Sequence, residues 1–445
     1  MNIFSDQTIM ARRQRLTAAF NDILSSNESV IVYSGDPIHK PGGLDQQYPF
    51  LSHPIYYWLT GHRRHGGAVM FAKDLGWVDY VNPISQSERI WEGADEKSVD
   101  VSSSSFFSRK NISELPKDRS QFQEVYLFGQ LNFNDSNLVK VTSTAQQNKD
   151  REKQNLLKRK MDEVRRVKDH EEIQLIQRAA SIARFGYDEL RRIVKPGLTE
   201  RDLQIAYEST VLKHGSEKLP YETIVGSGKN AAVLHAIPTS KVIAEDDLIL
   251  IDAGVDLADY CVDITRVFAA SGKVSPRQKS MIEIVQTAQT NSINACTAGA
   301  HWKDIHRISA STIAEGLKSL NILKGNVEDI LNSGAISVFF PHGVGHMVGL
   351  RVRDVGFEEN TEPQKHCGVI LRVDMPIQEN HILTVEPGCY FISALLNNTE
   401  LKTKYNEFIN WHETAKWMDF GGVRIEDDIL ITDSKPINLT DVVSR

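Results

Sequence analysis

The stretch LILIDAGVDLADYCVDITRVF, residues 248–268, predicts a β-hairpin with an acidic residue on each strand. Asp252 ends the first apolar run and Asp263 begins the second, and apolar runs bounded by turn residues are typical of buried strands. With the turn centred at 257–258, we expect the two aspartates to lie opposite each other. Because two adjacent buried carboxylates repel, one must take a proton or a cation must lie between them.

The same pattern, an apolar strand that runs into a carboxylate, recurs twice towards the C-terminus. The run ILTV, residues 382–385, leads into Glu386, and GGVRI, residues 421–425, leads into Glu426. Taken singly, an aspartate at a strand end is usually a turn or cap residue, and a glutamate in a strand usually forms a surface ion pair. Taken together, the four acids at the ends of apolar segments indicate a shared site for cations.

A histidine motif adds a nitrogen ligand to this set. PHGVGH, residues 341–346, places His342 and His346 four residues apart. This spacing suits a helical metal pair, but the glycines between the histidines disfavour a helix, so we expect one to bind metal and the other to reach the substrate. Carboxylates with one imidazole suit Mn, Co, Fe(II) or Zn. Several bridging carboxylates imply two metal ions, about 3.5–4 Å apart.

The composition argues against several classes of protein. The 445 residues include 58 acidic and 51 basic side chains, with a formal charge of −7 and 41% hydrophobic residues. This balance predicts no overall attraction to nucleic acid or to an anionic membrane. No apolar run approaches the ~20 residues that a membrane helix requires. The four cysteines form no CxxC pair and are too few for a disulfide framework, which indicates a reducing, intracellular setting.

The N-terminal segment bears on the location of the protein. Residues 1–24 contain three arginines with no continuous apolar run behind them, so they do not resemble a secretory signal. We expect a cytoplasmic protein, with a mitochondrial presequence as the alternative because the segment is amphipathic.

The chain is expected to form two domains, residues 1–160 and 161–445. The densely charged segment 148–172 is typical of a solvated helix or linker, because its acids and bases are interspersed; a nucleic-acid patch is the alternative. Strands are expected at 29–34, 68–72, 78–81, 125–129, 382–385 and 423–431. Helices are expected at 7–24, 171–194, 199–214, 276–295 and 302–320.

Five stretches together resemble the pita-bread metallopeptidases, in particular their Xaa-Pro dipeptidase (prolidase) and aminopeptidase P branch. They are IVGSGKNAAVLH, the hairpin sequence 248–268, PHGVGHMVGLRVRDVG, LTVEPGCYF and FGGVRIEDDILIT, in the order of that family. The resemblance covers about residues 160–435 and implies an α+β fold with a pita-bread catalytic domain. YPFLSHPIYYWLTG and ERIWEG are weaker echoes of a smaller, creatinase-type mixed α/β domain at the N-terminus.

The resemblance implies a metal-binding role for five residues. The ligands would be Asp252, Asp263, His346, Glu386 and Glu426, with Asp263 and Glu426 bridging two divalent ions. Manganese is the metal expected, with cobalt or zinc as alternatives. The ions would activate a water molecule for attack on a peptide bond.

The resemblance also implies roles for residues around the metal site. Glu386 would carry the proton from the water to the leaving nitrogen, and His342 would stabilise the tetrahedral intermediate. His235 matches a histidine that contacts the substrate. Arg424 and Tyr390 match an arginine and a tyrosine of the active site that bind the substrate.

The chain departs from the family pattern at two positions. Arg353 stands where the family has a substrate-binding histidine, and Lys229 stands where an acid is common. A guanidinium is permanently charged and binds carboxylates through two N–H groups, so Arg353 would hold a substrate carboxylate or narrow the pocket. These changes put the substrate in question rather than the metal site.

The length of one connection favours one branch of the family. Glu386 and Glu426 lie 40 positions apart, which is longer than in bacterial-type aminopeptidase P and similar to prolidase. We therefore expect hydrolysis of Xaa-Pro dipeptides, by an enzyme that forms a homodimer and binds neither nucleic acid nor membrane. The alternatives are an aminopeptidase P that removes the residue before proline, a dinuclear hydrolase whose substrate Arg353 has shifted, and a non-catalytic binding module.

Overall fold

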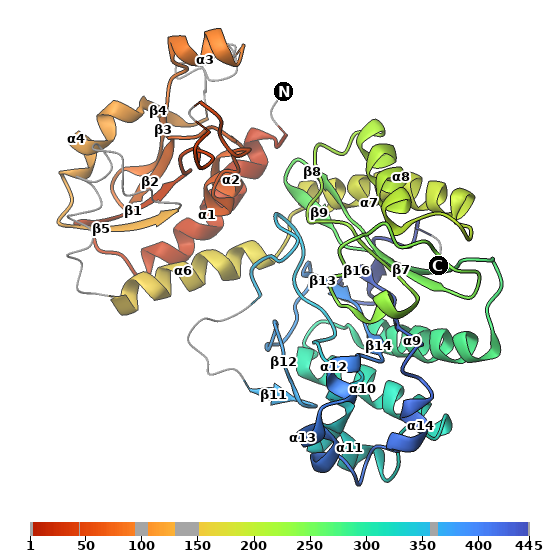
Figure 1. Ribbon diagram of the computed structural model, residues 1–445. Helices are drawn as coiled ribbons and strands as arrows, with labels where there is room; N and C mark the ends of the chain where they lie inside the picture. Colours follow the sequence, from red (N-terminus) through yellow and green to blue (C-terminus); the bar gives the residue numbers. More distant parts are fainter. Residues whose placement is uncertain (1–2, 44, 94–105, 130–150, 357–363, 444–445) are drawn as a thin grey trace. The chain divides into compact units, whose positions relative to one another are not determined.

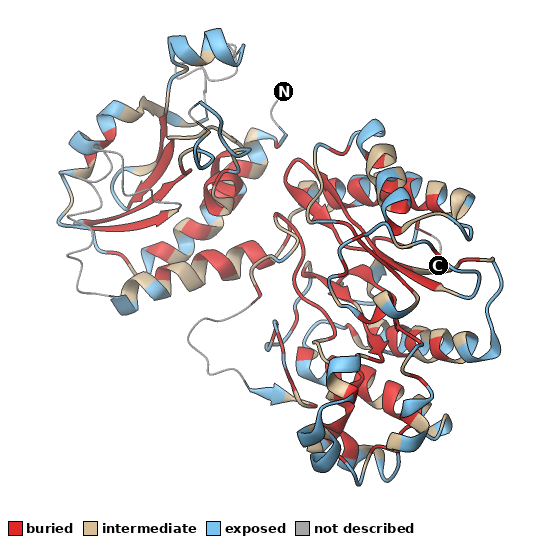
Figure 2. Cartoon of the chain, in the orientation of Figure 1, coloured by how far each residue is buried: buried red, intermediate tan, exposed pale blue. Residues whose placement is uncertain are grey.

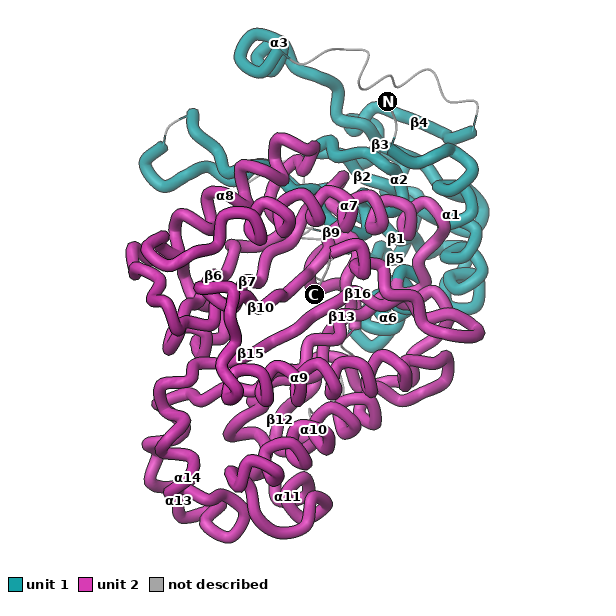
Figure 3. Tube along the Cα trace, turned by 90° about the vertical axis from the view of Figure 1, so that its right-hand side faces the viewer, with its two compact units in different colours: residues 1–165 teal, residues 166–445 magenta. Residues whose placement is uncertain are grey.

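The computed structural model describes residues 3–43, 45–93, 106–129, 151–356 and 364–443, and it forms two compact units (Figure 3). Unit 1 comprises residues 1–165 and unit 2 comprises residues 166–445. The charged segment expected at the boundary forms helix α6 (Arg151–Arg166), and residues 148–150 of that prediction lie outside the described residues. The division after residue 160 stays a prediction.

Unit 1 is built on one mixed sheet with the strand order β4-β3-β2-β1-β5. Its strands are β1 (Glu28–Tyr33), β2 (Ala68–Ala72), β3 (Gly76–Val81), β4 (Ser108–Asn111) and β5 (Glu124–Gly129). Besides α6, its helices are α1 (Asp6–Asn21), α2 (Pro54–Thr60), α3 (Gln86–Trp91) and α4 (Leu115–Arg119). The central strand β1 is buried along its whole length, and it pairs antiparallel with β2 and parallel with β5. The mixed α/β character predicted for this part of the chain is confirmed.

Unit 2 combines several small sheets with long helices (Figure 1). Its strands are β6 (Ile224–Ser227), β7 (Leu248–Asp252), β8 (Val255–Leu257), β9 (Tyr260–Val262), β10 (Thr265–Ala269), β11 (Lys365–His366), β12 (Val369–Ile370), β13 (Ile382–Val385), β14 (Gly388–Tyr390), β15 (Gly422–Arg424), β16 (Asp427–Leu430) and β17 (Ile437–Asn438). Its α-helices are α7 (His170–Ile193), α8 (Glu200–Lys213), α9 (Pro276–Ala295), α10 (Trp302–Ser319), α11 (Val327–Ser333), α12 (Ser393–Leu396), α13 (Thr399–Lys404) and α14 (Trp411–Ala415).

The long helices begin at capping sequences and bury one face each. Thr199 accepts a hydrogen bond from the backbone N–H of Asp202, and the Asp202 carboxylate accepts one from the backbone N–H of Thr199, so the two residues form a capping box at the start of α8. Helix α7 packs on β8 and β9, α8 packs on β6, and α9 packs on β13, β14 and β15. The sheets lie buried between these helices (Figure 2). No helix among the described residues is long and apolar enough to cross a bilayer.

The hairpin that opens the catalytic sequence has a different register from the one expected. Its turn is formed by Ala258 and Asp259, both at positive φ, rather than by residues 257–258. Asp252 therefore pairs with Thr265, two residues beyond Asp263. The expectation that the two aspartates lie directly opposite each other was wrong. They remain diagonal neighbours on one face, because side chains two residues apart point to the same side of a strand.

The strand expected at 423–431 is interrupted at Glu426, one of the predicted metal ligands. Strand β15 ends at Arg424 and β16 begins at Asp427, and Glu426 lies between them. Strand β15 pairs with β14, whereas β16 pairs with β13. The chain thus changes sheets at Glu426, whose backbone N–H donates to the carbonyl of Thr265. This bridge brings Glu426 to the hairpin that carries Asp252 and Asp263.

Candidate metal centre and active site

A cavity of about 1030 Å³ in unit 2 collects the residues that the sequence singled out. The predicted residues that line it are Asp252, Asp263, His346, Glu386, Glu426, His235, His342, Arg353 and Arg424. They come from segments that are up to 191 residues apart in the sequence, and the sheets and the loops between them bring these segments together. Tyr390 is the exception, because it is fully buried and contacts the cavity-lining residues from behind.

Three buried residues offer ligand atoms close enough for one metal ion. One atom each from Asp263, His346 and Glu426 lies within 4.8 Å of the other two. The His346 Nε2 atom is 3.5 Å from Asp263 Oδ2 and 3.8 Å from Glu386 Oε1. The other ring nitrogen, Nδ1, lies 3.0 Å from the carbonyl of Met347 and donates to it in the neutral ring. This contact leaves the lone pair of Nε2 directed at the carboxylates, as a metal ligand requires.

Asp252 has one paired and one unpaired carboxylate oxygen. Its Oδ2 accepts from Arg424 Nη2 at 2.6 Å, while its Oδ1 is buried without a hydrogen-bond partner among the described residues. Burial raises the pKa of Asp252 to about 7; Arg424 opposes this shift and Asp263 adds to it. A buried, unpartnered carboxylate oxygen is costly, and a cation in front of it removes that cost.

The other acids show the same crowding of negative charge. Burial and then Asp263, Glu386 and Asp252 raise the pKa of Glu426 well above its usual range. Burial also opposes ionisation of Asp263, but contacts with His346 and Tyr221 lower its pKa. Arg424 is the one lysine or arginine among the described residues that forms an ion pair with any of the four acids. The set of oxygen ligands with one imidazole therefore fits divalent cations such as Mn, Co or Zn.

A chain of hydrogen bonds links Arg424 to His342, whose ring lies beside Glu386. Arg424 Nη1 donates to the Tyr390 hydroxyl at 3.0 Å, and this hydroxyl lies 2.9 Å from His342 Nε2. The His342 Nδ1 atom lies 2.8 Å from the carbonyl of Gly343 and 3.8 Å from Glu386 Oε2. Burial lowers the pKa of His342, so its ring is neutral near pH 7. Because the carbonyl can only accept, the proton of the neutral ring is on Nδ1, and Nε2 accepts from Tyr390.

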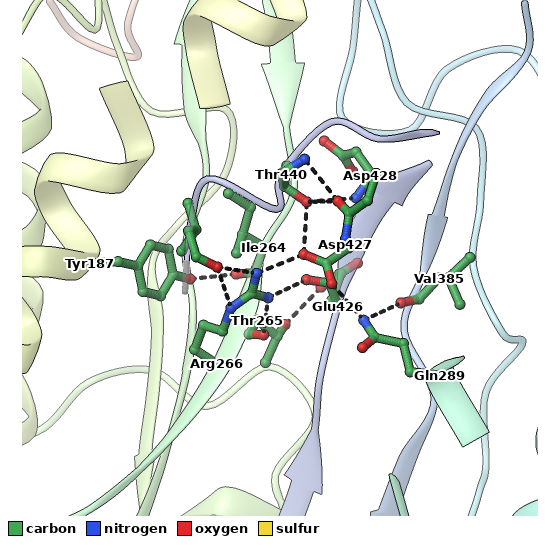
Figure 4. A network of polar contacts seen from close by, with 12 residues as sticks. Tyr187, Ile264, Thr265, Arg266, Gln289, Val385, Glu426, Asp427, Asp428 and Thr440 are labelled. Carbon is green, nitrogen blue, oxygen red and sulfur yellow. Dashed lines mark hydrogen bonds and ion pairs between the residues drawn. The ribbon is translucent and has the colours of Figure 1, made fainter. Parts of the chain in front are cut away.

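A buried polar network supports the hairpin and Glu426 from the opposite side (Figure 4). Thr265 donates from its hydroxyl to Glu426 Oε2 at 2.7 Å. The next residue, Arg266, donates to the carbonyls of Thr265 and Glu426 and to Asp427 Oδ1, at 3.0, 2.6 and 2.6 Å. Asp428 Oδ2 accepts the backbone N–H of Asp263 at 3.1 Å. The network thus holds the backbone of two of the predicted ligands.

These supporting residues were missed at the level of sequence. The signal for them was the pair Asp427–Asp428 directly after Glu426. Adjacent acidic residues within an apolar strand sequence are rarely buried without partners, so they indicate a buried polar network. Tyr221 was also missed; its hydroxyl donates to Asp263 Oδ1 at 2.6 Å and lines the cavity. Arg372 is a further cavity residue that the sequence analysis did not single out.

His235 lies on an exposed part of the cavity wall, in a loop organised by Glu200. The buried Glu200 carboxylate accepts hydrogen bonds from Ser227, Asn230 and Thr239, which flank the loop on both sides. Burial lowers the pKa of His235, as do the positive charges of Arg353, Arg424 and Arg372. The ring of His235 has no hydrogen-bond partner among the described residues, which leaves both nitrogens available to a ligand in the cavity.

Lys229, the second departure from the family pattern, is not part of this wall. Its ammonium forms an ion pair with Asp419 at 2.7 Å, and both side chains are largely exposed. It contributes a surface charge rather than a contact in the cavity.

Comparison with protein families gives two matches. Residues 174–433 match the profile described as Metallopeptidase family M24, and residues 9–116 match that of the aminopeptidase P N-terminal domain. A probable Xaa-Pro aminopeptidase of Aspergillus fumigatus is 31% identical over 440 residues, covering 94% of this chain and 88% of that protein. One from Botryotinia fuckeliana is 35% identical over 288 residues, covering 65% of this chain and 63% of that protein, less than two thirds of its length.

A solved structure has the same fold. The aminopeptidase PepP of Pseudomonas aeruginosa superposes with a TM-score of 0.81 at 23% identity, covering 100% of this chain and 97% of that one. The superposition confirms the expected α+β architecture of a catalytic domain preceded by a smaller mixed domain.

Proposed function

The chain belongs to metallopeptidase family M24, as its resemblance to the pita-bread metallopeptidases predicted, and we propose that it is an Xaa-Pro aminopeptidase. Such an enzyme releases the N-terminal residue of a peptide whose second residue is proline. The observation that carries the proposal is the cavity in which Asp263, His346 and Glu426 meet within 4.8 Å beside His235 and Glu386.

The choice of an aminopeptidase over a dipeptidase follows the relatives. The fungal proteins that align with most of this chain bear the name Xaa-Pro aminopeptidase, and this favours the alternative over the dipeptidase that we expected from the connection between Glu386 and Glu426. Much of that connection forms α12, α13 and α14, which pack as part of the hydrophobic core around Leu396, Ile409 and Trp417. Its length therefore reflects core structure and is a weak indicator of substrate size.

We assign the metal ligands to the five residues named from the sequence. Asp252, Asp263, His346, Glu386 and Glu426 would hold two divalent ions, with manganese as the first candidate. When bound, such ions lower the pKa of a water molecule towards neutrality and polarise the scissile carbonyl. The unpaired Oδ1 of Asp252 and the repulsion among the four acids support a site built for more than one positive charge.

The residues around the ligands would bind and orient the peptide. The free amino group of the substrate is attracted by the acid cluster, in which Arg424 is the one paired lysine or arginine among the described residues. Proline on the leaving side contributes a tertiary amide without an N–H, so its recognition depends on the shape of the pocket and on contacts to the carbonyls. His235, with both ring nitrogens available on the cavity wall, is placed to donate to a substrate carbonyl.

Glu386 would transfer the proton between the attacking water and the leaving nitrogen. This role requires a carboxylate that is held in place and yet accessible, and Glu386 is only partly buried on the cavity wall. His342 Nδ1 donates to the carbonyl of Gly343 and lies 3.8 Å from Glu386 Oε2, while Nε2 accepts from Tyr390. Because both nitrogens of the neutral ring are engaged, we assign His342 to positioning Glu386 and leave stabilisation of the oxyanion to His235.

The proposal is tested with matched peptides. The purified protein is stripped of metal with a chelator, and Mn, Co or Zn is returned to separate samples. Each sample receives Ala-Pro-Leu, the dipeptide Ala-Pro, and Ala-Ala-Leu as the control without proline. Release of alanine from Ala-Pro-Leu alone, and only with metal, is the result expected.

Each other pattern points to a different function. Cleavage of Ala-Pro alone would identify a dipeptidase, and equal cleavage of Ala-Ala-Leu would identify a general aminopeptidase. Absence of hydrolysis with all three metals would favour a binding module or a hydrolase with another substrate.

A further inference from the structure

Of the four arginines that line the main cavity, three form no ion pair with an acid in the part of the chain that the structure describes: Arg201, Arg353 and Arg372. Arg353 and Arg372 both line the main cavity, and both side chains are exposed. Neither forms a hydrogen bond or an ion pair with a carboxylate, in contrast to Arg424, which is paired with Asp252. Arg201 donates to the Gln204 amide oxygen, so Arg353 and Arg372 are the two cavity arginines with no side-chain acceptor among the described residues and with capacity for an anion.

The same two arginines also line an adjoining space. A cavity of about 290 Å³ is bounded by both of them together with His346, Met347, Asp354, Ile370 and Leu371. The carboxylate of Asp354 forms an ion pair with Lys168 at 2.7 Å. His346 borders both cavities, so the smaller one continues from the metal-ligand group. Its wall combines apolar side chains with two guanidinium groups, which suits an apolar residue next to a negative charge.

The two guanidinium groups act on each other as like charges. Partial burial is the main cause that lowers the pKa of Arg372, and the positive charge of Arg353 is the next. Two neighbouring cations repel each other when no anion lies between them, and an anion that contacts both offsets this repulsion. Guanidinium groups bind carboxylates through two parallel N–H···O bonds, which makes a carboxylate the ligand that best satisfies both.

We propose that Arg353 and Arg372 form a subsite for a substrate carboxylate, located on the leaving-group side of the scissile bond. This inference rests on the proposed function, because it places a peptide in the cavity. The amino group of a peptide would contact the acid cluster and its carboxylate would contact the arginine pair. One short peptide can satisfy both ends in the same cavity, whereas the N-terminus of a long chain satisfies only the first. The preferred substrate class is therefore a short Xaa-Pro-Yaa peptide with a free carboxylate.

The test compares acid and amide forms of the same peptide with the metal-loaded protein. Ala-Pro-Leu and Ala-Pro-Leu-amide are compared by kcat/KM, and the product dipeptide Pro-Leu and its amide are compared by calorimetric binding. Charge-assisted hydrogen bonds predict that the acid is preferred by about 10–100-fold in both measurements. Ala-Pro-Asp-amide asks whether a side-chain carboxylate is accepted in place of the terminal one; recovery of the lost activity would support a subsite that recognises either source.

The variants Arg353→Gln and Arg372→Gln should each reduce the preference for the acid by about tenfold. Arg353→Lys keeps the positive charge but loses the two parallel N–H groups of the guanidinium, so it should retain part of the preference for the acid form of the peptide. Arg178→Gln is the matched control; it removes an equal charge from an exposed position of helix α7 that lines neither cavity, and it should leave the acid-to-amide ratio unchanged. Thermal unfolding of each variant identifies any that fail to fold.

The binding measurement separates this inference from the proposed function. Acid-dependent binding of Pro-Leu without hydrolysis of any Xaa-Pro peptide would overturn the aminopeptidase and support the subsite. Hydrolysis of acid and amide at equal rates, with equal binding, would overturn the subsite and support the aminopeptidase. The same loss of preference in Arg178→Gln as in Arg353→Gln would also overturn it, since the effect would then be one of net charge.

Discussion

Arg266 Nη2 lies 2.6 Å from Asp427 Oδ1, and the two side chains are 2% and 0% exposed. The pair directly follows Thr265 and Glu426 in the sequence, and those two residues are themselves joined by a hydrogen bond of 2.7 Å. Neighbouring residues of an extended chain point to opposite sides. Thr265 and the predicted ligand Glu426 therefore lie on one side of the strands, and the ion pair of Arg266 with Asp427 lies on the other. Residues behind a metal site orient its ligands.

Asp427→Asn is expected to weaken metal binding. The amide cannot pair with the Arg266 charge, and the carbonyl of Glu426, which Arg266 holds, loses its orientation. Metal affinity should fall about 10–100-fold, as is typical for residues that support a ligand. Removing one partner of a buried pair also costs about 3–5 kcal/mol of stability. Calorimetric titration of the apoprotein with Mn measures the first effect and urea unfolding measures the second.

The exposed pair Arg307–Glu328 provides the control for this prediction. Arg307→Gln breaks an ion pair at the surface, far in sequence from the ligands, and should change neither metal affinity nor activity. Unchanged metal affinity in Asp427→Asn, with reduced stability, would show that the network serves the fold alone.

Asp263→Asn should abolish binding of the metal ions that Asp263 is proposed to bridge. The amide is neutral and replaces an oxygen that lies 3.5 Å from His346 Nε2. We expect the rate to fall by a factor of order 10³ or more, since the barrier then loses the stabilisation that a metal ion supplies. Metal content by mass spectrometry and kcat with Ala-Pro-Leu give the result. Asp246→Asn, an exposed aspartate of the same unit, is the matched control, and an active Asp263→Asn enzyme would refute the assignment.

Tyr390→Phe should lower kcat and leave metal content unchanged. Its hydroxyl accepts from Arg424 and donates to His342, so its loss leaves His342 Nε2 unpartnered and Glu386 less well held. A fall of about 10–100-fold in kcat is expected from a misplaced proton-transfer group. KM for Ala-Pro-Leu should change little, because Tyr390 is fully buried. Tyr405→Phe, another buried tyrosine, is the control; a raised KM with unchanged kcat would assign Tyr390 to substrate binding instead.

Glu200→Gln should destabilise the protein at neutral pH and much less in acid. Although burial raises it, hydrogen bonds from Ser227, Thr239 and Asn230 lower the pKa of Glu200 in the folded state. The stability that this lowered pKa provides is fully present above the unfolded pKa of about 4.3 and is lost as the pH falls through the folded value. Several hydrogen bonds to one charge predict a loss of about 2–4 kcal/mol at pH 7.

Urea unfolding of wild type and Glu200→Gln at pH 7 and in steps down to about pH 3, below the unfolded pKa of about 4.3, measures this difference. Glu245→Gln, an exposed glutamate near the same loop, should show no difference at any of these pH values. A stability difference between wild type and Glu200→Gln that is independent of pH would show that the amide disrupts packing rather than removing a buried charge.

The elements with strong periodicity were predictable from the sequence. Helix α9 and strands β2 and β13 have the bounds expected from their apolar patterns, and the helix begins at Pro276, whose φ suits a first turn. The turn of the catalytic hairpin was misplaced by one residue, because Ala258 and Asp259 adopt positive φ without a glycine to indicate it. A displaced turn of this kind changes which residues pair across the hairpin.

The five proposed metal ligands and the family were readable from the amino-acid sequence alone, because a carboxylate at the end of an apolar strand is unfavourable unless something binds it. The partners of those residues required the tertiary structure. The ion pair of Arg266 with Asp427 and the bond from Arg424 to Asp252 depend on distances between segments far apart in the chain. The same is true of the position of Arg353 and Arg372 in one cavity, where neither has an acidic partner among the described residues. A pattern along the chain shows which groups need a partner, whereas the partner is decided by the packing that brings distant segments within hydrogen-bonding distance.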